Sequence, residues 1–130
     1  MKIFNLQIGM SAEKSETVTT SNTAKAYGSG SIDVYATPAM IGLMEGASLT
    51  CVDPMLPQGM STVGTKLEIK HLAATSLGMT VTAKAELMQI EGKKLFFKVF
   101  AVDNHGIIGE GTHERFIVDI EKFLKKAKEK

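Results

Sequence analysis

One stretch decides how this chain folds: Val34-Tyr-Ala-Thr-Pro-Ala-Met-Ile-Gly-Leu-Met-Glu-Gly-Ala-Ser-Leu-Thr-Cys-Val52. Glu45 is its only charged residue. Thr37 is expected to cap the first free amides of a helix, and Pro38 fits the first turn, where a backbone N–H is not needed. The following Asp53-Pro54 ends the pattern. We therefore predict a helix over about residues 38–51. It is apolar on nearly every face, so other elements must cover most of it.

Four segments after this helix have the apolar patterns of β-strands: residues 63–73, 79–90, 95–102 and 107–118. The first alternates strictly, and we expect its odd positions, from Val63 to His71, to face inward. The third is apolar on both faces, as a central strand would be. The fourth contains Gly109 and Gly111, which suggest a bulge or a close backbone approach.

Two less regular segments flank this core. Residues 9–20 are interpreted as a first strand, and the lysine-rich residues 119–130 as a short exposed helix. A strand, one long apolar helix and four antiparallel strands together predict an α+β hotdog fold, in which a curved sheet wraps around the helix. The prediction is a single domain over residues 1–130. Such a sheet leaves an exposed edge, which edge-to-edge pairing in a dimer would protect.

Composition excludes several classes of function. A net charge of +1 gives no broad electrostatic field, so neither nucleic acid nor a membrane surface is an expected partner. Cys51 is the only cysteine, which favours a reducing compartment, and the N-terminus lacks a signal-peptide pattern, so we expect a cytoplasmic protein. The histidines and Cys51 have no metal-ligand spacing, and no nucleotide-binding glycine motif is present. We therefore expect no metal and no separate cofactor.

A carboxylate in so apolar a helix is costly to bury unless it is paired, which makes Glu45 a candidate for chemistry. Thr37, Ile41 and Glu45 are spaced i, i+4, i+8 and lie on one stripe of the helix. In the alternative interpretation, Glu45 extends to solvent at an exposed helix end and Thr37 only caps the first turn.

His71 continues the inward face of its strand and is expected to point toward the helix that carries Glu45. Together they could form an acid/base pair, although a lone inward histidine is more often a hydrogen-bonded core residue. His113 and Arg115 share one face of the last strand. They could belong to a salt-bridge cluster, or Arg115 could bind a phosphate with its planar guanidinium.

Three segments resemble the fluoroacetyl-CoA thioesterase family of hotdog proteins. They are Ala36-Thr-Pro-Ala-Met-Ile-Gly-Leu-Met-Glu-Gly-Ala47, then Val63-Gly-Thr-Lys-Leu-Glu-Ile-Lys-His-Leu-Ala-Ala-Thr75 with the following strand, and Gly109-Glu-Gly-Thr-His-Glu-Arg115 with its tail. They occur in the family's order over roughly residues 34–123. The resemblance implies an acyl-CoA thioesterase that acts as a homodimer or a dimer of dimers, with its site at the subunit interface.

The same resemblance implies roles for five residues. Thr37, Glu45 and His71 match the family's catalytic positions, Gly64 a glycine whose amide faces the thioester, and Arg115 an arginine that contacts coenzyme A. Glu45 would either attack the thioester carbonyl or activate water, and the sequence leaves both open. It also leaves open whether Glu45 and His71 meet within one subunit or across two.

The chain departs from the family in the loop before the helix. The fluoroacetyl-specific enzyme has a phenylalanine-rich lid there, whereas Tyr27-Gly-Ser-Gly-Ser-Ile-Asp33 contains no phenylalanine. We therefore expect a different acyl group. A non-catalytic dimer that binds acyl-CoA or another small ligand is the main alternative. A hotdog hydratase is less favoured, because the helix has no histidine.

Overall fold

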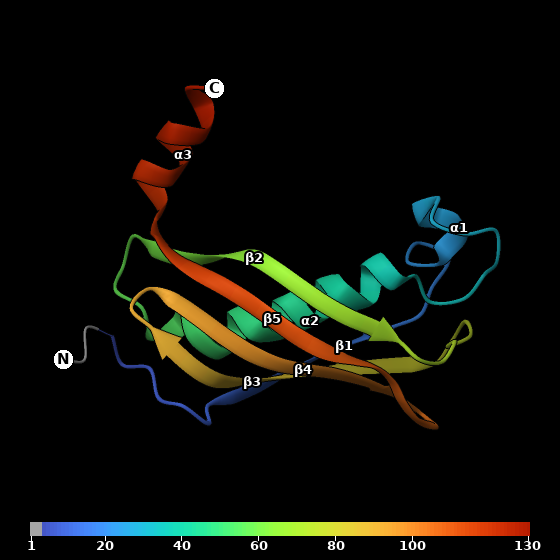
Figure 1. The fold of residues 1–130 in the computed structure, drawn as a ribbon. Coiled ribbons are helices and arrows are strands. Elements are labelled where there is room, and N and C mark those ends of the chain that lie inside the picture. The colour runs from blue at the N-terminus through green and yellow to red at the C-terminus, as the bar shows by residue number, and fades with distance from the viewer. Residues whose placement is uncertain (1–3) are drawn as a thin grey trace.

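A five-stranded antiparallel sheet curves around one long helix in the computed structural model, which describes residues 4–130 (Figure 1). The elements in chain order are β1 (Ser11–Thr17), α1 (Ala24–Tyr27), α2 (Thr37–Val52), the 3-10 turn η1 (Asp53–Met55), β2 (Met60–His71), β3 (Thr80–Glu91), β4 (Lys94–Asp103), β5 (Gly106–Asp119) and α3 (Ile120–Lys128). The strand order is β1-β3-β4-β5-β2, and each neighbouring pair is antiparallel. This arrangement confirms the predicted α+β hotdog fold.

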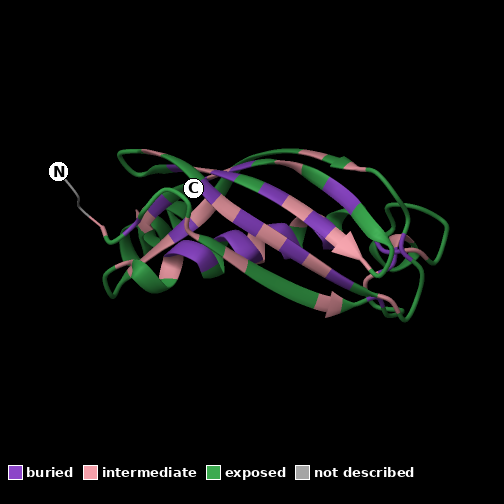
Figure 2. Ribbon diagram, turned by 90° about the horizontal axis from the view of Figure 1, so that it is seen from below, coloured by how far each residue is buried: buried purple, intermediate pink, exposed green. Residues whose placement is uncertain are grey.

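The core lies between α2 and the inner face of the sheet, where the buried residues of both elements meet (Figure 2). Met40 and Met44 of α2 are fully buried, and each such side chain contributes about 1.5–3 kcal/mol. Small residues on β3, among them Ala83 and Ala85, let the helix approach closely. Gly109 of β5 leaves the space that the Met40 side chain fills, so the predicted close approach at this glycine is confirmed.

The helix begins differently from the expectation that Thr37 caps it. Its N-cap is Ala36, which makes no side-chain hydrogen bond to the helix, and Thr37 already lies in the first turn. The Thr37 hydroxyl bonds to His71 instead. The capping prediction was therefore wrong, because the chain enters the helix one residue early, and this leaves the hydroxyl available for a contact across to β2.

The predicted alternation along β2 is wrong at its start. A β-bulge at Thr65 shifts the register, because Gly64 pairs with Arg115 whereas Lys66 pairs with Glu114. One extra residue exchanges the two faces of a strand, so Thr62, only 3% exposed, turns inward in place of Val63. Beyond the bulge the odd positions face inward as predicted, and these include His71.

The two sheet edges are β1 and β2. The C-terminal helix α3 leaves the end of β5 and projects away from the sheet beside the start of β2 (Figure 1). Along residues 4–130, no helix is both long enough and apolar enough to cross a membrane. The edge strand β2 is the one that carries His71, Gly64 and Thr62, so the candidate site lies beside an unpaired edge.

Candidate active site

Thr37 and His71 meet where the start of α2 faces the end of β2. The Thr37 Oγ1 and the His71 Nδ1 are 2.7 Å apart, which fixes the orientation of the ring. The other ring nitrogen, Nε2, is buried and has no hydrogen-bond partner among residues 4–130. Both side chains line a cavity of about 420 Å³ whose other walls are mostly small or apolar residues, among them Ala24, Ala73 and Ala74.

The position of His71 keeps its ring neutral at pH 7. Burial lowers the pKa of His71 from its ordinary value, and a contact with the backbone of Ala73 opposes that shift only in part. A neutral imidazole with one nitrogen fixed and the other unpartnered can accept a proton from a water or a substrate group. This end of the α2–β2 contact therefore has the chemistry of a general base.

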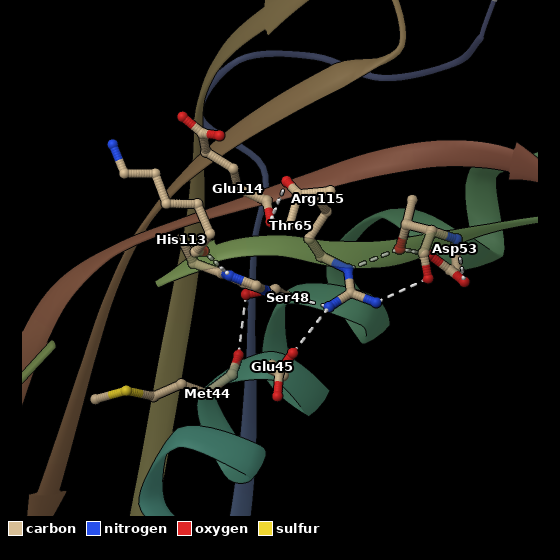
Figure 3. Close-up of polar contacts among 10 residues, drawn as sticks. Met44, Glu45, Ser48, Asp53, Thr65, His113, Glu114 and Arg115 are labelled. Atoms are coloured by element: carbon tan, nitrogen blue, oxygen red, sulfur yellow. Dashed lines mark hydrogen bonds and ion pairs between the residues drawn. The ribbon is translucent and has the colours of Figure 1, made fainter. Parts of the chain in front are cut away.

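Glu45 lies two turns further along α2, with its carboxylate against β2 (Figure 3). A Cβ atom on Gly64 would lie only 2.6 Å from the Glu45 Oε2, so the glycine at this position makes room for the carboxylate. The same oxygen is 3.9 Å from the Arg115 Nη1. The Glu45 side chain is 37% exposed, so one side of it remains open to solvent.

Arg115 is held inside the protein, with 6% of its side chain exposed. Its Nε donates to the Thr62 hydroxyl and its Nη2 to the Thr62 carbonyl, each over 2.8 Å. Its Nη1 faces the His113 Nε2 at 3.2 Å. Burial lowers the pKa of Arg115, while the Asp53 and Glu45 carboxylates oppose that shift. An arginine stays protonated at any physiological pH, so this is a buried cation beside the candidate carboxylate.

Asp53, Thr62 and His113 join the site although we did not predict a functional role for any of them. The Thr62 hydroxyl donates to the Asp53 Oδ1 over 2.6 Å and so links Asp53 to Arg115. His113 is 1% exposed, and its Nδ1 lies 2.8 Å from the Lys66 carbonyl. Of these three, only His113 gave a signal in the sequence, because it shares one strand face with Arg115. Nothing in the sequence indicated the bulge that turns Thr62 inward.

The structure brings the five predicted site residues together as two groups. Thr37 and His71 form one, and Glu45, Gly64 and Arg115 form the other. Thr37 and Glu45 are eight residues apart, about 12 Å along the helix axis. Gly64 and His71 are separated by about 20 Å along β2. Within one protomer, the acid/base pair of Glu45 and His71 is therefore not formed.

Cys51 does not add a nucleophile to this site. Cys51 is buried in the core, and burial raises the pKa of its thiol, which makes it a poor nucleophile at pH 7. Within the described part of the chain, no group of three or more histidine, cysteine, aspartate or glutamate side chains could hold a metal ion. The described residues bring a carboxylate, an imidazole, a hydroxyl and a guanidinium to the site.

A sheet wrapped around one apolar helix, with a carboxylate on that helix and a histidine on the facing edge strand, defines a hotdog-fold thioesterase. Comparison with known proteins agrees. A model of the fluoroacetyl-CoA-specific thioesterase family, FlK, matches residues 18–121. The fluoroacetyl-CoA thioesterase of Streptantibioticus cattleyicolor is 44% identical over 98 residues, which are 75% of this chain and 70% of that protein. The chain belongs to the fluoroacetyl-CoA-specific thioesterase family and is a thioester hydrolase that acts on acyl-CoA.

Solved structures agree with this assignment. The structure of FlK is 36% identical and superposes with a TM-score of 0.91 over 97% of this chain and 98% of the other. A thioesterase superfamily member from Thermus thermophilus is 30% identical and superposes with a TM-score of 0.85, covering 95% of this chain and 93% of that chain. The three segments that carried the resemblance in the sequence therefore identified the family correctly.

Proposed function

We propose that this chain hydrolyses small acyl-CoA thioesters at a site assembled from two copies of itself. Glu45 and Gly64 come from one copy, and Thr37 and His71 come from the other. The observation that carries this proposal is the separation of the two groups: Glu45 is seated on Gly64, out of reach of the His71 ring in its own protomer. A dimer that brings the groups together supplies both a carboxylate and a base to one thioester.

The free edge of β2 supports a dimer of this kind. Backbone groups along an unpaired edge favour pairing with another strand, and a two-fold axis makes such pairing antiparallel. Antiparallel pairing of two β2 strands can bring Gly64 of one copy beside the partner's His71. Leu67, 36% exposed on the inward side of β2, lies between these two positions and would be covered in the dimer.

In the proposed mechanism Glu45 has one of two roles. Either its carboxylate attacks the thioester carbonyl, which expels the coenzyme A thiolate and leaves a mixed anhydride for water to cleave, or it removes a proton from the attacking water. In the first route the partner's His71 takes the proton of the hydrolytic water and passes it to the coenzyme A thiolate. In the second route Glu45 itself passes the water proton to the thiolate, and the partner's His71 orients the water. Thr37 orients that histidine, and the Gly64 N–H donates to the developing oxyanion. No cofactor is needed beyond the coenzyme A of the substrate.

The acyl group proposed here is small and not fluorinated. The loop over residues 27–33 is exposed and has no phenylalanine to close an apolar lid over the cavity beside Thr37 and His71. The relatives are named for fluoroacetyl-CoA, and a variant of FlK has been solved in complex with acetyl-CoA. We therefore propose acetyl-CoA and similar short acyl-CoAs as substrates, without a large preference for the fluorinated one.

Thiol release from a panel of acyl-CoAs tests this function. We expect turnover of short acyl-CoAs by the wild type and a loss of about 10²–10⁴-fold in Glu45→Gln, which keeps the shape but not the charge. Glu110→Gln, at an exposed position of β5, is the matched control and should keep wild-type rates. Full activity of Glu45→Gln would remove Glu45 from the mechanism. A strong preference for fluoroacetyl-CoA would overturn the proposed substrate class.

Three further expectations from the sequence stay predictions: the contact of Arg115 with coenzyme A, the pairing of two dimers, and the cytoplasmic location. Arg115 has most of its donors engaged inside the protein, which favours an internal role over the phosphate contact.

A further inference from the structure

We propose that Asp53, Thr62 and His113 are positioning residues, which hold the Arg115 guanidinium beside Glu45 and thereby fix the carboxylate for reaction. This inference rests on the proposed role of Glu45 and assigns Arg115 to the carboxylate and not to the phosphates of coenzyme A. None of the three touches the thioester; each acts through Arg115.

Most of the guanidinium donors are engaged by groups of this chain. It has five N–H donors, and three of them are engaged by Thr62 and His113. Nη1 also faces Glu45 at 3.9 Å, a distance at which the charges attract without a direct hydrogen bond. Since Arg115 is only 5% exposed, its remaining donor capacity is not presented to solvent, where the coenzyme A phosphates would lie.

Asp53 anchors the arrangement at the end of the helix that carries Glu45. It is the C-cap of α2 and the first residue of η1. Its Oδ1 accepts the Thr62 hydroxyl proton, which leaves the lone pairs of that hydroxyl free to accept from the Arg115 Nε. The contacts thus form a ring that leaves α2 at Asp53, passes through Thr62 and Arg115, and returns to α2 at Glu45. A ring of this kind fixes the helix and its carboxylate relative to β2 (Figure 3).

His113 completes the support on the other side of the guanidinium. Its Nδ1 donates to the Lys66 carbonyl, so its Nε2 carries no proton and accepts from the Arg115 Nη1. This requires a neutral ring. Burial is the main cause that lowers the pKa of His113, and the Arg115 charge lowers it further, so the ring stays neutral at pH 7. His113 also lies against Gly64, where a Cβ would come within 3.1 Å of its ring.

Two hydroxyl deletions separate positioning from simple packing. Thr62→Val removes the hydroxyl that links Asp53 to Arg115. Ser61→Ala is the matched control: the Ser61 hydroxyl also donates to Asp53 over 2.6 Å, but it does not contact Arg115. Thr62→Ser, which keeps the hydroxyl, should restore activity. Each variant is assayed with an acyl-CoA and with the corresponding acyl-pantetheine, which lacks the nucleotide and its phosphates.

We expect Thr62→Val to lower kcat by about 10–100-fold with little change in KM, because a misplaced reactive group costs rate and not substrate affinity. The loss should be the same for acyl-CoA and acyl-pantetheine and absent in Ser61→Ala. In the Glu45→Gln background, Thr62→Val should cause no further loss, since it acts only through that carboxylate. If Thr62→Val lowers the melting temperature, Asp53→Asn is assayed in the same way, below the transition.

Three results would overturn the inference. A loss confined to acyl-CoA would assign Arg115 to the phosphates, equal losses in Ser61→Ala and Thr62→Val would indicate packing alone, and wild-type kcat in both Thr62→Val and Asp53→Asn would remove the positioning role. These results are distinct from a failure of the proposed function, because in that case the Glu45→Gln variant itself would keep its activity.

Discussion

The two ends of the contact between α2 and β2 hold their polar groups in opposite ways. At one end, His71 is fixed by Thr37 through one nitrogen, while its other nitrogen is buried without a hydrogen-bond partner among residues 4–130. At the other end, Arg115 is buried and bonded on three sides. A group that moves protons needs one free site, whereas a group that sets geometry is most useful when most of its hydrogen-bonding sites are taken.

Subunit complementation tests most sharply whether the two ends serve one reaction across a dimer. Glu45→Gln and His71→Ala should each be nearly inactive. Coexpressed with different tags, they form mixed dimers in which one of the two sites holds an intact Glu45 and an intact His71. If the subunits assort at random, about a quarter of wild-type activity should return, because half of the dimers are mixed and half of their sites are intact.

The control for this experiment is each variant coexpressed with a differently tagged copy of itself, which should stay inactive. If both groups belonged to one protomer, every subunit in the mixture would carry one lesion and no activity would return. A mixture as inactive as its parents, with mixed dimers demonstrated by tandem purification, contradicts the composite site.

Gly64→Ala should disturb only the end of the α2–β2 contact that holds Glu45 and Arg115. The new Cβ would lie 2.6 Å from the Glu45 Oε2, so the carboxylate must move. Displacing a reactive group by about 1 Å can cost about 100-fold in kcat, and we expect a loss of that order. Gly46→Ala is the matched control, because its Cβ meets only the flexible end of Lys14, and alanine is favoured over glycine in a helix. Equal activity of the two variants, measured by thiol release, would show that the space Gly64 leaves for the Glu45 carboxylate is not critical.

The sequence predicted the fold well because the fold follows from patterns of burial. The helix predicted over 38–51 spans Thr37–Val52, since an apolar run bounded by Pro38 and Asp53-Pro54 has few other solutions. β4, apolar on both faces, is the central strand of the sheet, as its composition indicated. Long, strongly patterned elements of this kind are decided by local composition and by the need to cover apolar surface.

The site was less predictable, because its geometry depends on details that no pattern encodes. The bulge at Thr65 is one inserted residue in a strand of otherwise regular alternation, yet it turns Thr62 toward Arg115. The expected meeting of Glu45 and His71 assumed that two inward side chains on facing elements lie close together. Their separation along both elements contradicts that assumption within a protomer, and only the arrangement in space reveals it.

Thr37→Val tests the end of the α2–β2 contact that holds Thr37 and His71, and we expect a smaller effect on kcat. The variant keeps the volume of the side chain but removes the hydroxyl that fixes the His71 Nδ1. Proton transfer by a positioned side chain raises the rate by about 10²–10⁴-fold. Since only the orientation of His71 is lost in this variant, we expect kcat to fall by about tenfold. Thr37→Ser keeps the hydroxyl and should stay close to the wild type. If Thr37→Val matches Thr37→Ser in single-turnover assays, the hydroxyl does not orient the base.

The smallest expected effect is on how the free energy of unfolding depends on pH through His113. The pKa of His113 is lower in the folded protein than its ordinary value of about 6.5 in the unfolded chain. Below that value the unfolded state binds the proton more readily, so the free energy of unfolding should fall as the pH drops from 6.5 toward 5. His71 shifts in the same direction and contributes likewise. In urea unfolding experiments, the free energy of unfolding of His113→Asn should therefore decline less steeply over this pH window than that of the wild type. His71→Asn is the matched comparison. An unchanged slope in His113→Asn would mean that His113 is not held neutral beside Arg115, and the support we assign to it would lose its physical basis.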